Sequence, residues 1–126
     1  MSKIIGIGTD ICAVSRMEKA ITKTHFYERV FFEEERMYLE GKENARPQSA
    51  AAMFAAKEAV AKALGTGFIH GIMPWTIEVT HEENGAPGVR LHGAAKERME
   101  ALGGERIHLS LSHEGDNAMA FVIIEG

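Results

Sequence analysis

The chain has 126 residues, of which 45% are hydrophobic and 25% charged, and its formal net charge is −4. This length fits one domain, and the composition excludes disordered and collagen-like classes. The acidic balance also argues against a general nucleic-acid binder. No apolar run is longer than seven residues, so we expect no membrane span. The single cysteine, Cys12, and an N-terminus without a signal-peptide pattern favour the cytoplasm.

The positive charge is concentrated in the first half of the chain. Residues 1–63 carry 10 Lys and Arg against 9 Asp and Glu, whereas residues 64–126 carry 4 against 9. An anionic partner is therefore expected to dock on the first half.

The N-terminal region predicts a strand followed by short helices. Residues 3–11 read as a strand whose period of two places Gly6, Gly8 and Asp10 on one face. A capping-box pattern from Ser15 to Glu18 predicts a helix that begins near residues 13–16. One face of that helix would hold three basic residues: Arg16, Lys19 and Lys23. Residues 26–45 resemble short, acidic helical pieces.

The clearest predicted helix is alanine-rich and spans Gln48–Leu64, with Gly65-Thr66-Gly67 as its C-terminal stop. Glu58 and Lys62 lie one turn apart on this helix, beside Ala51 and Ala55. The helical period predicts a core-facing stripe on another face, made of Met53, Ala56, Val60, Ala63 and Leu64.

The second half predicts mostly strands. An Asn84-Gly85 turn joins two alternating segments, Trp75–Val79 and Val89–Leu91, into a hairpin. A short helix over residues 94–102 is followed by an alternating strand over residues 107–112. The segment Ala118–Ile124 is apolar on both faces, which is typical of a central or interface strand. The order of elements indicates one α+β domain with a mainly antiparallel sheet.

Three residues in this pattern could carry chemistry. Asp10 ends an apolar strand, and a buried carboxylate is costly unless it is paired or bound to a metal. Together with Glu58 and Lys62 it would suit Mg²⁺ and a phosphorylated ligand. Gly6 and Gly8 would let something bulky approach the strand, and the alanines beside Glu58 would let a ligand approach the helix closely. The alternatives are a capping or loop-facing aspartate and an ordinary surface ion pair. Dinucleotide, P-loop, helical zinc and serine-hydrolase motifs are missing.

The strings that carry these residues resemble a known family. Gly6-Ile-Gly-Thr-Asp10-Ile, the segment from Phe54 to Gly67 (FAAKEAVAKALGTG), and Ser110-Leu-Ser-His113 before an Ala-rich closing strand are similar to the holo-[acyl-carrier-protein] synthase family. These are the small, bacterial-type 4′-phosphopantetheinyl transferases. The resemblance covers essentially the whole chain, and its central motif is the most specific part.

The resemblance implies a fold, a reaction and an assembly. The fold would be one domain over residues 1–126 with a long central helix, forming a homotrimer with coenzyme A between subunits. The enzyme would transfer the phosphopantetheine arm of coenzyme A to a serine of apo acyl carrier protein and release adenosine 3′,5′-bisphosphate. Other possibilities are a non-catalytic coenzyme-A-binding scaffold and a Mg²⁺-dependent hydrolase of the pyrophosphate bond.

The resemblance also implies roles for particular residues. Asp10 and Glu58 match the family's Mg²⁺ ligands, and Lys62 matches the lysine that contacts the transferred phosphate. The base that accepts the serine proton stays open between Asp10, Glu58 and a water on the metal. Coenzyme A contacts are implied for Gly65, Thr66 and Gly67, and, from a neighbouring chain, for Arg46, Asn84, Gly85, Pro87, Ser112 and His113.

The first helix is implied to meet the acidic carrier protein, with Arg16 as its main contact and Lys19 and Lys23 beside it; the alternative is a solvated basic face. His113 could equally be a structural histidine at a strand end. Two positions depart from the family pattern: Met53 stands where an arginine is common, and Asn117 stands where an aromatic residue is common.

Overall fold

The computed structural model describes residues 2–126 as an α+β domain built on two antiparallel sheets. A three-stranded sheet has the order β1-β5-β4, with β1 at Ile4–Ala13, β4 at Arg106–Glu114 and β5 at Asn117–Glu125. Strands β2 (Ile77–His81) and β3 (Pro87–Leu91) form a separate hairpin. The predicted fold class and the central place of Ala118–Ile124 are confirmed.

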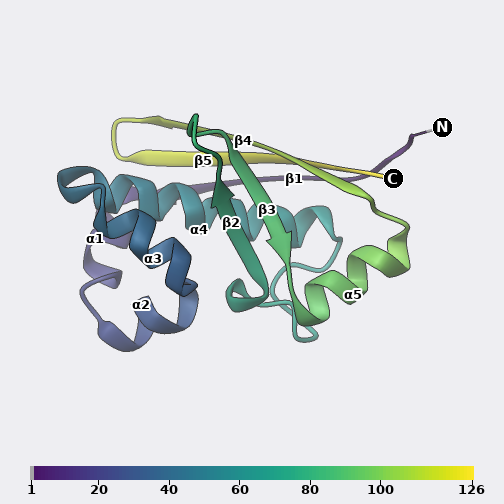
Figure 1. Cartoon of the computed structure of the whole chain (residues 1–126), viewed down its shortest axis with the longest axis horizontal. Helices are drawn as coiled ribbons and strands as arrows, with labels where there is room; N and C mark the ends of the chain where they lie inside the picture. The colour runs from purple at the N-terminus through teal and green to yellow at the C-terminus, as the bar shows by residue number, and fades with distance from the viewer. Residues whose placement is uncertain (1) are drawn as a thin grey trace.

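The helices lie on one side of the long strands (Figure 1). Helix α4 runs beneath the sheet, with α1 to α3 near one end and α5 near the other. The predicted helix Gln48–Leu64 is confirmed within two residues at each end. The bounds are α1 Val14–Ala20, α2 Thr24–Val30, α3 Glu33–Glu40, α4 Arg46–Ala63 and α5 Gly93–Leu102, with 3₁₀ turns at Glu43–Ala45 and Pro74–Thr76.

Helix α1 is capped from across the chain, and not by its own capping box. Asp116, in the β4–β5 turn, accepts hydrogen bonds from the Ser15 backbone N–H at 2.9 Å and the Ser15 hydroxyl at 2.7 Å. The predicted box from Ser15 to Glu18 is therefore wrong, because Ser15 lies inside the helix and uses its hydroxyl on Asp116. Trp75 also departs from prediction, since it lies in a 3₁₀ turn before β2.

Helix α4 packs very closely on β1, and glycines make this possible. A Cβ on Gly6 would lie 1.9 Å from the Ala63 carbonyl oxygen, and one on Gly8 would lie 1.8 Å from that of Ala59. The expectation that these glycines let something bulky approach the strand is confirmed, and the bulky group is helix α4. Ala51 and Ala55 are fully buried in the core, so they give no ligand an approach.

Helix α4 ends as predicted at the Gly65-Thr66-Gly67 segment. Gly65 has φ +83°, the left-handed conformation that suits glycine. Its N–H bonds to the Lys62 carbonyl, and the Thr66 N–H bonds to the Ala61 carbonyl. This pair of bonds is a Schellman motif, and it fixes where the chain leaves the helix.

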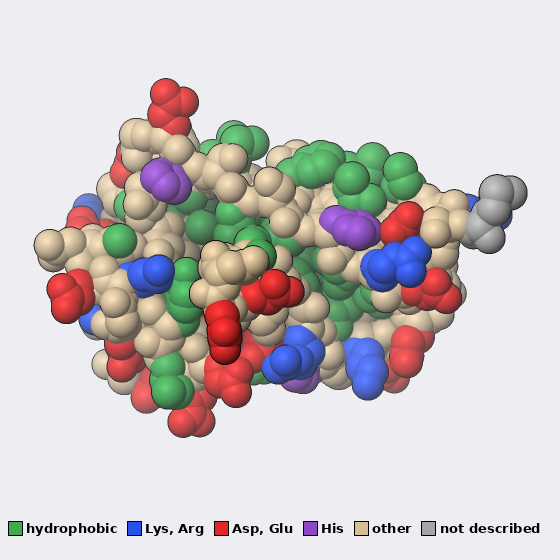
Figure 2. Space-filling model, turned by 45° about the horizontal axis from the view of Figure 1, so that its top comes forward, with side chains coloured by type: hydrophobic (Ala, Val, Ile, Leu, Met, Phe, Trp, Pro, Cys, Tyr) green, Lys and Arg blue, Asp and Glu red, His purple; other side chains and the backbone are tan. Residues whose placement is uncertain are grey.

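The opposite face of the long sheet is open and apolar along β1 and β5. Its exposed large hydrophobic side chains are Ile4, Ile7, Ile11, Met119 and Phe121, which are 40–64% exposed. Strand β4 adds exposed polar side chains to the same face, among them His108 and Ser110. Hydrophobic side chains gather along the upper edge of Figure 2, where the long strands lie. Within residues 2–126, no helix has the length and apolar character needed to cross a bilayer.

Candidate active site

Strand β1 and helix α4 bring two carboxylates and an ammonium together. The Lys62 ammonium donates hydrogen bonds to Asp10 Oδ1 and to the Thr9 carbonyl oxygen, both at 3.0 Å. The Asp10 side chain is 15% exposed and that of Lys62 is 51% exposed, so the pair lies at the rim of the core. The register of β1 turns Asp10 to the face that α4 covers, which is why residues 52 positions apart meet.

Glu58 completes this cluster. Burial raises the pKa of the Glu58 carboxyl, and the negative charge of Asp10, within hydrogen-bonding reach, raises it further. The positive charges of Lys62 and Arg16 act in the opposite direction. Lys62 forms an ion pair with Asp10, whereas neither Lys62 nor Arg16 is within ion-pair distance of Glu58 in residues 2–126, so the Glu58 carboxylate is left for a cation to neutralise.

The donor set fits Mg²⁺. This ion is commonly held by one or two carboxylates, with water and phosphate oxygens at its remaining positions. Within residues 2–126, no group of three or more His, Cys, Asp and Glu side chains is placed to hold a metal. Asp10 and Glu58 would therefore hold the ion only with oxygens from a substrate and from water.

A pocket of 370 Å³ opens beside the two carboxylates. Arg16 lines it together with Asp10 and Glu58, and its remaining wall is mostly apolar. That wall is made of Ile11, Cys12, Met17, Ala20, Phe26 and Phe54. The pocket thus joins a charged end to an apolar chamber under α1 and α2.

Cys12 in this wall is not a reactive thiol. Its side chain is buried, and burial raises the pKa of the thiol above its ordinary value. The thiolate is the reactive form of cysteine, so Cys12 acts as an apolar wall residue.

The basic residues predicted on one helical face lie in two segments. Arg16 and Lys19 are exposed on α1, but α1 ends at Ala20. Lys23 is exposed at the N-cap of α2. The prediction that all three share one helical face is therefore wrong, because the chain turns between Lys19 and Lys23.

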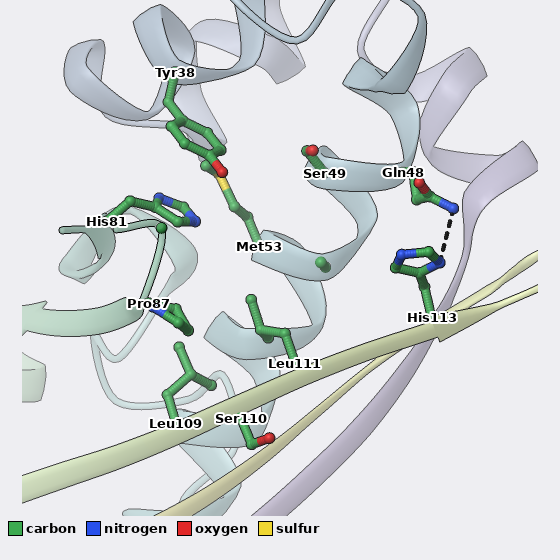
Figure 3. A pocket seen from close by; sticks show the side chains of 12 residues that line it. Tyr38, Gln48, Ser49, Met53, His81, Pro87, Leu109, Ser110, Leu111 and His113 are labelled. Carbon is green, nitrogen blue, oxygen red and sulfur yellow. Dashed lines mark hydrogen bonds between the residues drawn. The ribbon is translucent and has the colours of Figure 1, made fainter. Parts of the chain in front are cut away.

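A second pocket, of 390 Å³, lies between the other end of α4, the β2–β3 hairpin and β4 (Figure 3). It brings together three of the residues implied for coenzyme A: Gly85, Pro87 and His113. Met53, the residue that replaces the common arginine, also lines this pocket, so the wall there is apolar.

Sequence reasoning missed three other residues of this second pocket. Gln48 Nε2 lies 3.0 Å from His113 Nδ1, and the rings of Tyr38 and His81 stack with their centroids 3.7 Å apart (Figure 3). No local pattern marks these residues, because each pair joins segments far apart in the sequence.

The remaining residues implied for coenzyme A do not meet in one place within the chain. Ser112 lines a pocket on the outer face of the sheet with Ile11, Asn117 and Met119. The Arg46 side chain donates to the Leu39 and Glu40 carbonyls at the end of α3. The Asn84 side chain accepts from the Ala86 N–H within its own turn.

Two groups of residues implied for coenzyme A lie at opposite ends of α4. Its 18 residues correspond to about 27 Å, which separates Arg46 from the Gly65–Gly67 segment. A ligand that contacts both groups would therefore have to be long or to lie between two chains.

Comparisons with known proteins agree on one family. A family model described as the 4′-phosphopantetheinyl transferase superfamily matches residues 6–122. The chain is similar to the holo-[acyl-carrier-protein] synthase of Clostridium tetani, with 48% identity over 124 residues that cover 98% of this chain and 97% of the relative.

Solved structures give the same result. The holo-[acyl-carrier-protein] synthase of Neisseria meningitidis matches with a TM-score of 0.86 and 34% identity, covering 98% of this chain and 100% of that one. The Helicobacter pylori enzyme, solved in complex with coenzyme A, matches with a TM-score of 0.81 and 31% identity over 94% of this chain and 98% of that one. With the motifs and the fold both matched over nearly the full length, the chain belongs to the 4′-phosphopantetheinyl transferase superfamily.

Proposed function

We propose that the protein is a holo-[acyl-carrier-protein] synthase, which transfers the 4′-phosphopantetheine arm of coenzyme A to a serine of apo acyl carrier protein. The observation that carries this proposal is the cluster of Asp10 and Glu58 with Lys62 beside it. Similarity to synthases over the full length of the chain supports the same activity.

Asp10 and Glu58 would hold Mg²⁺, together with the diphosphate of coenzyme A. When bound there, the ion would neutralise charge on the diphosphate and stabilise the negative charge that develops during transfer. The two carboxylates supply the counter-charge that keeps the ion at this end of the pocket.

Lys62 would act on the transferred phosphate. Its ammonium is half exposed and flexible enough to move from Asp10 toward a phosphate oxygen. In the transfer, the serine oxygen bonds to the phosphorus and the bond from phosphorus to the adenosine 3′,5′-bisphosphate oxygen breaks. Lys62 offsets the charge on the phosphate oxygens during this exchange.

The serine proton would pass to a carboxylate of the cluster, directly or through one water. Glu58 is the better placed of the two to accept it, because Asp10 already accepts a hydrogen bond from Lys62.

The carrier protein would dock beside α1. Arg16 lines the pocket that contains Asp10 and Glu58, and Lys19 is exposed on the same short helix. Lys23 lies after the loop that follows α1, at the N-cap of α2, and adds positive charge to this surface. An acidic carrier held here would present its serine to the charged end of the pocket.

The active unit would be a homotrimer with coenzyme A between subunits. Two features support this arrangement: the residues implied for coenzyme A lie at opposite ends of α4, and the outer face of the long sheet is apolar and open along β1 and β5. Light scattering in solution should give the mass of three chains. A mass of one chain at working concentration, with full activity, would contradict the trimer.

One assay tests the function. The protein is mixed with coenzyme A, Mg²⁺ and apo carrier, and the carrier is weighed by mass spectrometry. A gain of one phosphopantetheine on the carrier is the expected result. Coenzyme A cleavage without this gain would indicate the hydrolase, and binding without cleavage would indicate the scaffold; either result would overturn the proposal.

A further inference from the structure

A buried ion pair lies next to the candidate active site and takes no part in the proposed chemistry. Lys57 and Glu35 have no side-chain exposure, and their charged atoms are 2.9 Å apart. Lys57 directly precedes Glu58 on α4, whereas Glu35 lies on α3.

Every polar atom of the pair is used. The Lys57 ammonium has three hydrogens, and it donates to Glu35 Oε1, to the Pro74 carbonyl at 3.1 Å and to the Ile77 carbonyl at 2.5 Å. Glu35 also accepts from the Phe32 and Val79 backbone N–H groups, both at 2.7 Å. The pair therefore joins α4 to α3, to the Pro74–Thr76 turn and to β2.

Much of the rest of α4 is made of small side chains. Eight of its 18 residues are alanine. Their small side chains, with the glycines of β1, set how closely α4 approaches the strand. Small side chains constrain rotation about the helix axis less than directional hydrogen bonds do, so the contacts of Lys57 add to the packing of Met53 and Val60.

We infer that Lys57 and Glu35 form a positioning pair that sets the rotation of α4 and so aims Glu58 and Lys62 at Asp10. Neighbouring residues on a helix point about 100° apart, so holding Lys57 inward against α3 and β2 turns Glu58 to the rim beside β1. A small rotation of α4 would move both Glu58 and Lys62 away from Asp10. This inference rests on the proposed function.

The test uses the full chain and three variants of the pair: Lys57→Met, Glu35→Gln and the double variant. The double variant removes both charges and so avoids a lone buried ion. Two core variants, Leu102→Ala on α5 and Ile124→Ala on β5, serve as controls because they lower stability in elements that the pair does not join. All proteins are studied at a temperature at which each is fully folded by circular dichroism.

Two quantities are measured for each variant. The first is the affinity for Mn²⁺ in the presence of coenzyme A, from the electron paramagnetic resonance signal of free Mn²⁺. The second is the rate of carrier modification at saturating coenzyme A. We expect the double variant to lose about tenfold or more in both, since displaced supporting residues commonly cost 10- to 100-fold in metal affinity or activity. The core variants should stay within about twofold of wild type.

Three results would overturn the inference. The first is that folded pair variants keep the wild-type Mn²⁺ affinity and the wild-type rate of carrier modification. The second is that core variants of equal stability lose as much Mn²⁺ affinity and rate as the pair variants. Wild-type protein that modifies no carrier would contradict the proposed function itself, and the inference with it. The first two results leave wild-type transfer intact, so the two failures are distinguishable.

Discussion

Two neighbouring residues of α4, Lys57 and Glu58, belong to ionic clusters of opposite character. Lys57 lies in a fully buried pair with one charge of each sign, and all its donors are satisfied. Glu58 lies in a cluster at the rim in which two carboxylates have one lysine, half exposed, at ion-pair distance.

The difference separates a structural cluster from a binding site. Burial and balanced charge leave nothing for a ligand to supply in the Lys57 pair. In the Glu58 cluster, two carboxylates lie at an open pocket with one lysine at ion-pair distance, which is an arrangement that a cation could complete. Residue types alone do not make this distinction, because each cluster consists of lysine and acidic residues.

The largest effect is expected from the acids at the rim. Asp10→Asn and Glu58→Gln should each abolish Mg²⁺-dependent carrier modification, because each removes half of the proposed metal site. The control is Glu97→Gln, an exposed acid on α5. Mass spectrometry of the carrier gives the rate, and circular dichroism checks the fold. Full activity in either site variant would contradict the metal assignment.

The buried pair should also have a large effect on stability. Lys57→Met leaves the Glu35 carboxylate buried without a partner, which typically costs about 3–5 kcal/mol in the free energy of unfolding. The double variant with Glu35→Gln should lose less, because the amide can still accept from Val79. Urea denaturation measures both losses. Equal losses for the single and double variants would show that the two charges are not coupled.

A moderate effect is expected at the proposed docking surface. Arg16→Glu should raise KM for the carrier about tenfold by charge repulsion and leave the affinity for coenzyme A nearly unchanged. Lys96→Glu, an exposed reversal on α5, is the matched control. Steady-state kinetics separates the two substrates. If Arg16→Glu weakened both substrates equally, Arg16 would belong to the coenzyme A site.

The smallest effect concerns stability without metal. The pKa of Glu58 is raised in the fold, so its ionised form is disfavoured relative to the unfolded chain at neutral pH. Metal-free Glu58→Gln should therefore melt slightly above wild type at pH 7. The difference in melting temperature should disappear as the pH falls through the raised pKa toward 4.5, because Glu58 then becomes protonated and uncharged. Thermal melts from pH 7 to pH 4 test this, and a wild type that melts higher at pH 7 would refute it.

Much of the fold could be predicted from local patterns. The alternation of Ile107, Leu109 and Leu111 marks β4, and the Asn84-Gly85 turn marks the hairpin, because these signals depend on neighbouring residues. Residue types and spacing singled out Asp10, Glu58 and Lys62, the resemblance added their roles, and the structure brings the three side chains together.

The errors share a physical cause, which is contact between distant segments. Ala51 and Ala55 are buried in the core, and Asp116 caps α1 from 101 residues away. The position of Lys57 in the sequence does indicate that its side chain is buried. Lys57 lies four residues after Met53 and three before Val60, on the core face of the helix, where a lysine needs a buried partner. Its partner, Glu35, could not have been found from spacing.

The central claim is that Asp10 and Glu58 together hold one divalent ion against the diphosphate of coenzyme A. Anomalous diffraction from crystals grown with coenzyme A and Mn²⁺ tests this most directly. The account predicts a single manganese peak between the two carboxylates, in contact with diphosphate oxygens. Bound coenzyme A with no peak there, or with a peak held by other residues, would contradict it.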